Sequence, residues 1–260
     1  MKYFNFLFIF LFASFISNAQ PNKLFATNNY TAIDQNTPLS LVGGSILHLD
    51  AGNTSSYIGS GTSWNDISGS GNNMTVPGVL ASTFTGTNGG SFLFGKTNTH
   101  SIVNNSLTNF GFGSNAITVE VWFKWVVTTD YQFWFSDNTA NYRFGINSSG
   151  NYFWNMGSRN DRVNNTYTLP SGVWKHIVFT GGLESGSIVT RLYVNGAFVF
   201  SLNEGYASLR SMTGLLLGAG ENTTVYLLKG NLAVVRVYQK ALTANEVLQN
   251  FNVSKAKFGL

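Results

Sequence analysis

The chain has no cysteine among its 260 residues. This absence excludes a disulfide framework, and it excludes a lipoprotein anchor, which is attached to a cysteine at the cleavage site. Stability must therefore come from a packed core alone. A chain of this length can bury such a core, since an all-β sandwich of about 200–250 residues commonly forms one domain.

Charge is also scarce. Lys, Arg, Asp and Glu together make up only 10% of the residues, and the net charge of +4 is scattered along the chain. A protein that binds nucleic acid would carry a basic stripe, and none is visible. Gly, Asn, Ser and Thr are abundant instead. We therefore expect a surface that is mostly uncharged and rich in hydrogen-bonding groups.

Long apolar runs are confined to the N-terminus. Lys2 precedes an almost unbroken apolar run from Phe4 to Ile16, and small residues lead up to Ala19. The run is shorter than the roughly 20 apolar residues that span a bilayer. We therefore predict a signal peptide at residues 1–19, cleaved near Ala19, and export to the medium or the cell surface. The alternative is an uncleaved membrane anchor. No span is predicted in the mature chain.

Residues 20–43 are polar and irregular, and we interpret them as a lead-in segment, with a first edge strand as the alternative. After them come short runs of aromatic and β-branched residues separated by Gly, Asn, Ser and Thr, which predict strands. Asn195-Gly196 predicts a type I′ hairpin turn. The predicted strands cover residues 45–50, 91–95, 116–125, 131–136, 141–147, 151–156, 173–181, 187–195, 197–202, 214–218 and 230–239.

One helix is predicted, near the C-terminus. Thr243 followed three residues later by Glu246 forms a capping box, and Val247, Leu248 and Phe251 follow at helical spacing. Strands without interleaved helices favour an antiparallel arrangement. The fold class is therefore all-β, an antiparallel β-sandwich of the jelly-roll type with one short C-terminal helix.

Four stretches carry a family resemblance: "GVWKHIVFTGGLESGSIVTRLYVNGAFV" (172–199), "GNLAVVRVYQKALTANEVLQNF" (230–251), "ITVEVWFKW" (117–125) and "LDAGNTSSY…WNDISGSGNN" (49–73). Together they resemble laminin G-like domains of the concanavalin A-like lectin/glucanase superfamily, in its bacterial and phage form. The resemblance covers roughly residues 44–260 and implies a single concanavalin A-like domain. It implies little about function, because lectins, adhesins, structural modules and glycan-cleaving enzymes share this fold.

The resemblance raises the question of calcium. Family members often bind Ca²⁺ through an acidic pair ahead of the Val-Arg-Val-Tyr strand, but Ala233-Val234 stands there in this chain. A site could instead be built from the N-terminal loops, whose oxygen-bearing side chains suit Ca²⁺. The alternative is that these side chains stabilise turns. The candidate ligands are Asp50, Asn53, Asp66, Asn72 and Asn73.

Catalytic residues are not evident. Glycan hydrolysis needs two carboxyl groups on either side of the scissile bond, whereas the glutamates of this chain are isolated in the sequence: Glu120, Glu184, Glu204, Glu221 and Glu246. His48, His100 and His176 occur in unrelated contexts, which argues against a lyase site. The prediction is therefore a non-enzymatic protein, with a polysaccharide lyase or glycoside hydrolase as the weaker alternative.

Aromatic side chains are the candidates for glycan contact, because sugar rings present apolar C–H faces. The aromatic candidates are Tyr57, Trp64, Trp134, Tyr142, Tyr152 and Trp154. Arg143 and Asn155 would supply polar contacts beside them. Core packing is the alternative for each ring, since aromatic residues dominate sandwich cores. Tyr57 and Trp64 lie in polar loops, so these two are expected to be exposed.

The leading functional hypothesis is a secreted or cell-surface, non-catalytic module that binds carbohydrate or mediates adhesion. Its partner would be a glycan or a component of a cell surface or matrix, and not nucleic acid. The alternative is a structural or assembly protein, such as a phage virion component. The C-terminal stretch "LQNFNVSKAKFGL" (248–260) resembles the closing segment of laminin G-like domains in phage structural proteins.

Overall fold

A computed structural model describes residues 40–104, 115–158, 161–220 and 222–260. Residues Leu39–Leu260 form one compact unit. The predicted signal peptide, nearly all of the lead-in segment and Glu221 lie outside the described residues.

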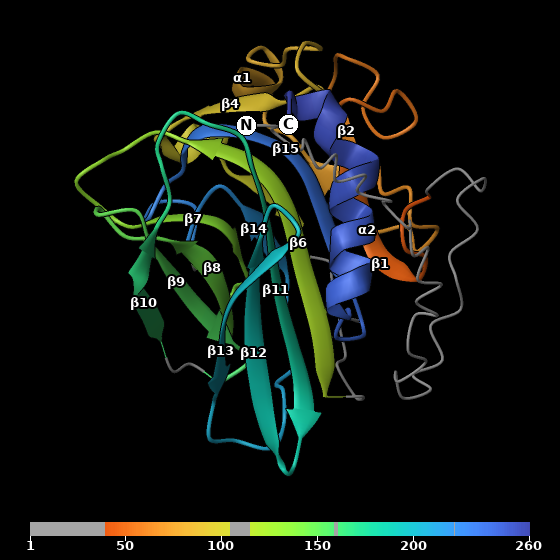
Figure 1. Ribbon diagram of the computed structural model, residues 1–260. Coiled ribbons are helices and arrows are strands. Elements are labelled where there is room, and N and C mark those ends of the chain that lie inside the picture. Colours follow the sequence, from red (N-terminus) through yellow and green to blue (C-terminus); the bar gives the residue numbers. More distant parts are fainter. Residues whose placement is uncertain (1–39, 105–114, 159–160, 221) are drawn as a thin grey trace, which may run out of the picture. The chain divides into compact units, whose positions relative to one another are not determined.

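Two antiparallel sheets make up the unit (Figure 1). The first has seven strands in the order β1-β15-β6-β11-β12-β13, with β4 also paired to β15. Its strands are β1 (Ser45–Asp50), β4 (Phe92–Gly95), β6 (Ala116–Trp125), β11 (Lys175–Glu184), β12 (Ser187–Val194), β13 (Ala197–Asn203) and β15 (Lys229–Tyr238).

The second sheet has eight strands in the order β10-β9-β8-β7-β14-β5-β3-β2. These are β2 (Ser63–Trp64), β3 (Met74–Thr75), β5 (Ile102–Asn104), β7 (Gln132–Ser136), β8 (Tyr142–Ile146), β9 (Asn151–Met156), β10 (Arg162–Thr168) and β14 (Leu215–Leu217). Short helical segments are α1 (Gly78–Ala81), α2 (Ala244–Ser254), η1 (Asn98–His100) and η2 (Lys255–Phe258). Among the described residues, no helix has the length and apolar content needed to cross a membrane.

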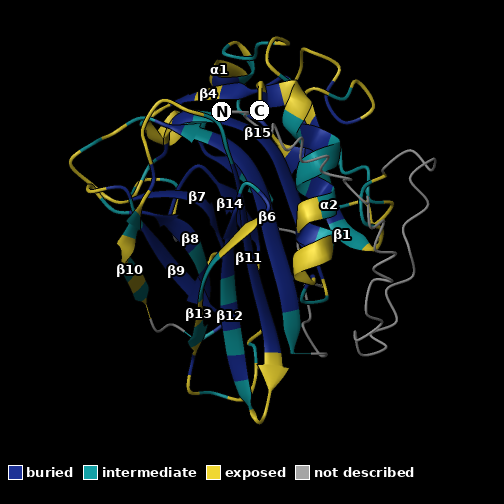
Figure 2. Ribbon diagram, viewed as in Figure 1, coloured by how far each residue is buried: buried dark blue, intermediate teal, exposed yellow. Residues whose placement is uncertain are grey.

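The core lies between the two sheets and follows the period-two alternation of the strands. In β6, Val119, Val121 and Phe123 point into it, and in β9 Tyr152 and Trp154 do the same from the opposite sheet. Figure 2 shows the central strands buried, with exposed residues at edges and loops. The predicted all-β, antiparallel sandwich is confirmed.

A β-bulge in β7 interrupts this alternation. Phe133 pairs with Gly145 of β8, but the register shifts before Phe135 pairs with Phe144. Trp134 and Phe135 therefore both enter the core, although they are adjacent in sequence. Phe133 remains on the opposite face of the sheet.

Local turn and cap chemistry agrees with the predictions. Asn195 and Gly196 connect β12 to β13 with φ of 51° and 78°, the positive values that a type I′ turn requires. The side chain of Thr243 accepts a hydrogen bond from the backbone N–H of Glu246, and the Glu246 carboxylate accepts one in return, so the capping box is formed.

A buried polar network fixes α2 to the first sheet. Glu120 of β6 lies against the Nε2 of His176 in β11 at 3.0 Å and pairs with the Arg236 guanidinium of β15. Its second oxygen accepts a hydrogen bond from the amide of Asn250 in α2 at 2.7 Å. Burial would raise the pKa of Glu120, but Arg236 and the hydrogen bond with His176 outweigh it and lower the pKa to about 2. The carboxylate is therefore ionised in the folded protein.

His48 is expected to make the stability of the unit depend on pH in mild acid. Burial, together with the nearby positive charge of Arg236, lowers the pKa of His48 to about 4. Its Nε2 is buried without a hydrogen-bond partner among the described residues. The pKa of His48 is lower in the folded protein than its unfolded value of 6.5, so folding disfavours the protonated imidazole. The contribution of His48 to the free energy of unfolding is therefore complete above pH 6.5 and is lost as the pH falls towards 4.

We therefore expect the free energy of unfolding to fall by on the order of 3 kcal/mol between pH 6.5 and 4 because of this one group. Urea unfolding of the wild type and of His48→Gln across this range measures the effect. The variant should show a shallower dependence on pH. Equal slopes for the two proteins would contradict the assignment to His48.

Candidate functional site

The face of the second sheet that points away from the core carries a patch of aromatic rings. Phe153 in β9 alternates with the core residues Tyr152 and Trp154, so its ring faces outward, and Phe133 lies beside it through the bulge in β7. Between them is Gly145, where a Cβ atom would come within 2.5 Å of the Phe133 ring. The glycine therefore leaves space for that ring to lie close to the sheet.

Two tyrosines complete the patch. Tyr131 precedes β7, and Tyr226 comes from the loop that leads to β15. Each of these rings packs edge-to-face against Phe133 or Phe153, with centroids 5.1–5.2 Å apart for Tyr131–Phe153, Phe133–Phe153 and Phe133–Tyr226. The two phenylalanines form a buried floor, whereas Tyr131 and Tyr226 are 37% and 39% exposed. We refer to these four residues as the aromatic platform.

A charged pair borders the platform on one side. The guanidinium of Arg143 in β8 lies 5.9 Å from the centre of the Phe153 ring and 2.5 Å from a carboxylate oxygen of Asp161. These residues and the aromatic platform line a pocket of about 240 Å³. The pocket therefore combines aromatic rings with fixed hydrogen-bonding groups, the composition typical of small-ligand sites.

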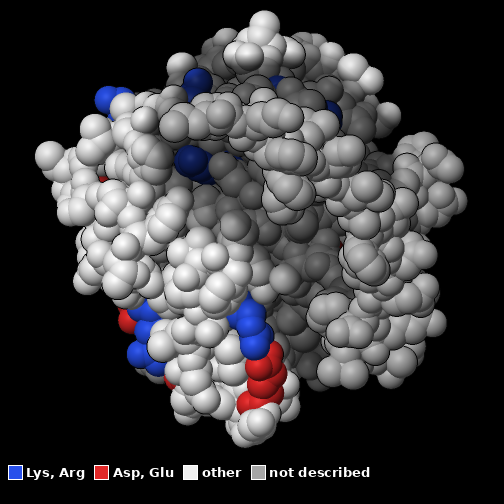
Figure 3. Space-filling view, viewed as in Figure 1, with Lys and Arg blue, Asp and Glu red and all other residues white. Residues whose placement is uncertain are grey.

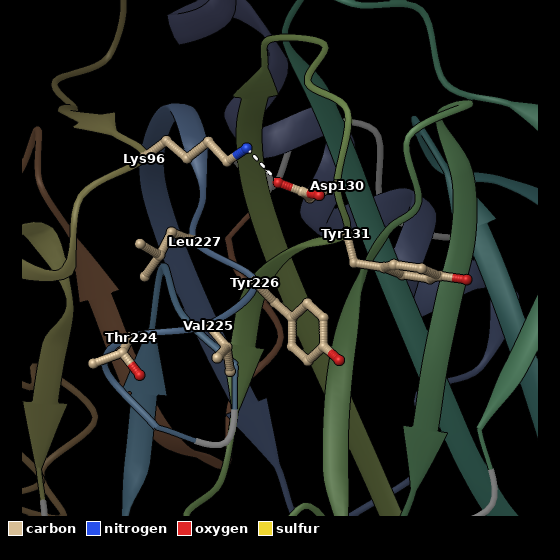
Figure 4. A pocket seen from close by; sticks show the side chains of 7 residues that line it. All are labelled: Lys96, Asp130, Tyr131, Thr224, Val225, Tyr226 and Leu227. Carbon is tan, nitrogen blue, oxygen red and sulfur yellow. Dashed lines mark hydrogen bonds and ion pairs between the residues drawn. The ribbon is translucent and has the colours of Figure 1, made fainter.

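A second pocket of about 310 Å³ meets the first at Tyr131 and Tyr226. It contains the ion pair between Lys96 and Asp130, whose Nζ and carboxylate oxygen are 2.6 Å apart. Figure 4 shows this pair above the rings of Tyr131 and Tyr226. The loop residues Thr224, Val225 and Leu227 form the rest of the lining.

The aromatic residues expected to contact glycan are instead in the core. Tyr57 is 1% exposed, Trp64 and Trp134 are 0% exposed, and Trp154 is 2% exposed; Tyr142 and Tyr152 are also buried. The expected exposure of Tyr57 and Trp64 was therefore wrong. Their rings pack edge-to-face on Phe92 of β4, at centroid distances of 4.8 and 5.0 Å, so the polar loops turn their aromatic side chains inward.

The polar candidates Arg143 and Asn155 are placed on the outward face, as the alternation of β8 and β9 predicts. Arg143 reaches the pocket beside Phe153. Asn155 is buried below it, and its amide lies 3.3 Å from the same Asp161 oxygen that Arg143 contacts. Asn155 thus helps to orient Asp161. Tyr131, Phe133 and Phe153 could have been found from the positions opposite Trp134 and Trp154 in the sequence, whereas Tyr226 belongs to a distant loop.

The candidate calcium ligands take part in loop hydrogen bonds. The Asp66 carboxylate accepts the backbone N–H groups of His48, Ser68 and Asn72, at 2.8–2.9 Å. Asn73 accepts the N–H of Asp66, and the Asn72 amide donates to a backbone carbonyl. These are the turn-stabilising roles of Asx side chains.

Asp50 and Asn53 are engaged in the same way. Asp50 accepts the N–H of Gly52 at 3.0 Å and forms an ion pair with Lys257 at 2.8 Å, while Asn53 accepts the N–H of Ser55. The described part of the chain contains no group of three His, Cys, Asp or Glu side chains arranged to hold a metal. With a lysine on Asp50 and N–H donors on Asp66, this donor set does not fit a calcium site without rearrangement.

The side chains of the described glutamates form hydrogen bonds and ion pairs that support the fold. Glu120 belongs to the network under α2, and Glu204 accepts hydrogen bonds from Trp154 and Thr190 and pairs with Arg162. Glu184 pairs with Arg191, and Glu246 caps α2. Charged groups are also sparse on the molecular face shown in Figure 3. The platform is therefore the described feature best suited to bind a ligand.

Comparison with known proteins identifies the family to which this fold belongs. The chain belongs to the concanavalin A-like lectin/glucanases superfamily, whose laminin G-type family model matches residues 94–248. The predicted resemblance is thus confirmed. No curated protein matches the chain.

Solved structures of the same fold include several binding domains. The receptor-binding domain of botulinum neurotoxin type G is 15% identical with a TM-score of 0.60, covering 81% of this chain and 51% of that one. The binding domain of Paraclostridial mosquitocidal protein 1 is 19% identical with a TM-score of 0.57, covering 80% and 52%. This chain thus spans about half the length of these two domains.

Domain 4 of AbnA, an extracellular arabinanase from Geobacillus stearothermophilus, matches over nearly its whole length. It is 18% identical with a TM-score of 0.54, covering 81% of this chain and 98% of that one, and its structure was solved in complex with arabinotriose. At such identities the likeness establishes the shared fold.

Proposed function

We propose that this protein is a non-catalytic carbohydrate-binding module and that the aromatic platform is its glycan-binding surface. The observation that carries the proposal is the pair of half-exposed tyrosine rings above a buried phenylalanine floor, with the Arg143–Asp161 pair beside them. Aromatic rings pack on the C–H faces of sugars, and paired charged side chains offer hydrogen bonds to hydroxyl groups.

The fold neighbours support this proposal in a coarse way. The arabinanase domain was solved with arabinotriose, and a botulinum neurotoxin binding domain of the same fold was solved in complex with SialylT. A secreted or surface location and a role in adhesion extend the proposal, and they rest on the predicted signal peptide. Calcium in the Asp50 and Asp66 loops, which the sequence suggested, would require these side chains to give up their present hydrogen bonds and ion pair, and it is tested separately.

A glycan array probed with residues 20–260, in calcium and again in chelator, tests the function. The array should include arabinose oligomers and sialylated glycans. Binding that is unchanged by chelator would agree with the hydrogen-bonded state of the Asp50 and Asp66 loops. Binding that requires calcium would support a metal site there and would mean that Asp50 and Asp66 exchange their hydrogen bonds and ion pair for the metal.

Variants of the aromatic platform test whether glycan binds at this surface. Tyr226 has a φ of 53°, a left-handed conformation that asparagine adopts readily. Tyr226→Asn therefore removes the ring at little cost to the backbone and should retain the wild-type Tm within a few degrees. We expect it to weaken glycan binding by about fivefold or more, since one stacked aromatic group contributes on the order of 1 kcal/mol or more.

Two comparisons make this result decisive. Phe153→Ala should abolish binding, because it removes the floor beneath Tyr131 and the ring beneath Arg143. Tyr206→Phe is the matched control, since its hydroxyl group hydrogen-bonds the Met156 carbonyl in a different pocket. Wild-type affinity in both platform variants would contradict the proposed function. Release of new reducing ends from a bound glycan would instead favour an enzyme.

A further inference from the structure

Two of the residues that line the second pocket, Lys96 and Tyr226, are held in an unfavourable backbone conformation. Most of the described non-glycine residues with a positive φ are Asn, Ala or Ser, but Lys96 and Tyr226 adopt values of 59° and 53°. Such conformations are uncommon for long side chains, and they persist where the surrounding structure enforces them. Both residues line the same pocket.

Hydrogen bonds from neighbouring elements enforce these conformations. The N–H of Lys96 donates to the carbonyl of Leu228 at 3.0 Å, and the N–H of Phe133 donates to the carbonyl of Tyr226 at 3.0 Å. The pocket walls, which come from the end of β4 and the loop before β15, are therefore joined to each other and to the platform.

Gln132 fixes the third wall, the 126–131 loop. Its buried amide donates to the carbonyl of Val126 at 2.9 Å and to the hydroxyl of Thr128 at 3.0 Å, while its oxygen accepts the N–H of Lys229 at 2.7 Å. Gln132 is thus a positioning residue for Asp130 and Tyr131. The pocket is preorganised, which reduces the entropy cost of binding.

The Lys96–Asp130 pair adds little to stability, because the two side chains are 31% and 60% exposed and such pairs contribute weakly. Its arrangement suits recognition instead. The ammonium group and the carboxylate neutralise each other, yet they keep further donors and acceptors for a ligand's hydroxyl groups. The Arg143–Asp161 pair has the same character at the other pocket. Two neutralised pairs suit an uncharged polyhydroxyl ligand better than an acidic one.

We propose that the two pockets are adjoining subsites for a neutral oligosaccharide of at least two sugar units. One unit occupies the pocket beside Arg143 and Asp161, the next occupies the pocket beside Lys96 and Asp130, and Tyr131 and Tyr226 contact both. This inference rests on the proposed function, and it adds the class and minimum length of the ligand.

The test measures affinity against chain length. The probes are the mono-, di-, tri- and tetrasaccharides of the β-1,4-glucose, β-1,4-xylose, β-1,4-mannose and α-1,5-arabinose series, titrated by calorimetry. In at least one series the trisaccharide should bind at least about tenfold more tightly than the monosaccharide, since a second subsite adds its own hydrogen bonds.

Two substitutions isolate the second subsite. Lys96→Asn suits the left-handed backbone at that position, and Asp130→Asn alters an exposed side chain, so both variants should fold normally. Each should weaken trisaccharide binding by about tenfold and leave monosaccharide binding unchanged. The control is Glu184→Gln, which breaks an exposed ion pair with Arg191 on the other sheet and should change neither affinity.

The outcomes separate the two proposals. Equal affinity for mono- and trisaccharides, or unaltered trisaccharide binding by both subsite variants, would overturn the second subsite while leaving the platform in place. Binding on the array to acidic glycans alone, with none of the four neutral series bound, would overturn the ligand class. Trisaccharide binding that survives Phe153→Ala would overturn the proposed function itself.

Discussion

Replacing Glu120 with alanine is expected to lower the free energy of unfolding by about 3–5 kcal/mol, because it breaks a buried ion pair by removing one partner. The Arg236 guanidinium is 2% exposed and would remain buried without its carboxylate. His176 and Asn250 would lose an acceptor at the same time. Because the network joins β6, β11, β15 and α2, we expect the helix to loosen first.

Chemical unfolding of Glu120→Ala, followed by circular dichroism, measures this effect. Glu184→Ala is the matched control, since it removes a carboxylate from an exposed pair with Arg191 on the same sheet and should change stability by no more than about 1 kcal/mol. If the two substitutions had equal effects, the Glu120 network would not stabilise the fold as described.

The pH dependence provides an independent check on the same residue. The pKa of Glu120 is lowered from 4.5 to about 2 on folding, so its contribution is complete above pH 4.5 and is lost as the pH falls towards 2. The wild type should lose stability across this interval, and Glu120→Ala should lose less. This interval lies below most of the range assigned to His48.

Most of the fold could be predicted because its strongest signals are local. The alternation in 116–125, the Asn195-Gly196 turn and the Thr243 capping box each depend on a few neighbouring residues, and the structure reproduces all three. Strand β10 was missed because "RVNNTYT" is polar and mostly exposed, as an edge strand can be. The antiparallel pairing with β9 holds these residues in a strand, although their sequence lacks the apolar pattern that predicts one.

The candidate site was predictable only in part. Alternation placed Arg143 on the correct face, but the bulge in β7 moved Trp134 and Phe135 together into the core, which no period-two pattern anticipates. Tyr226 joins the platform from a loop that follows Tyr131 and Phe133 by about ninety residues in the sequence. Such a contact depends on the order of strands in the sheet, so it becomes visible only when the fold is known.

Replacing Trp64 with alanine is expected to destabilise the protein by about 3–5 kcal/mol, the usual cost of removing a buried aromatic ring. Trp64 is fully buried and packs on Phe92 at 5.0 Å. Its indole N–H is buried with no acceptor among the described residues. Trp64→Phe removes that unsatisfied donor along with part of the ring, so its cost should be much smaller.

Thermal unfolding of the two variants, combined with the glycan array, distinguishes a core role from a ligand contact. A core residue gives a large fall in Tm for Trp64→Ala, a small one for Trp64→Phe, and unchanged binding well below the lowered Tm. A near-normal Tm with lost binding would instead mean that the ring is exposed in solution. That result would return the glycan site to the N-terminal loops, where the polar sequence first suggested it.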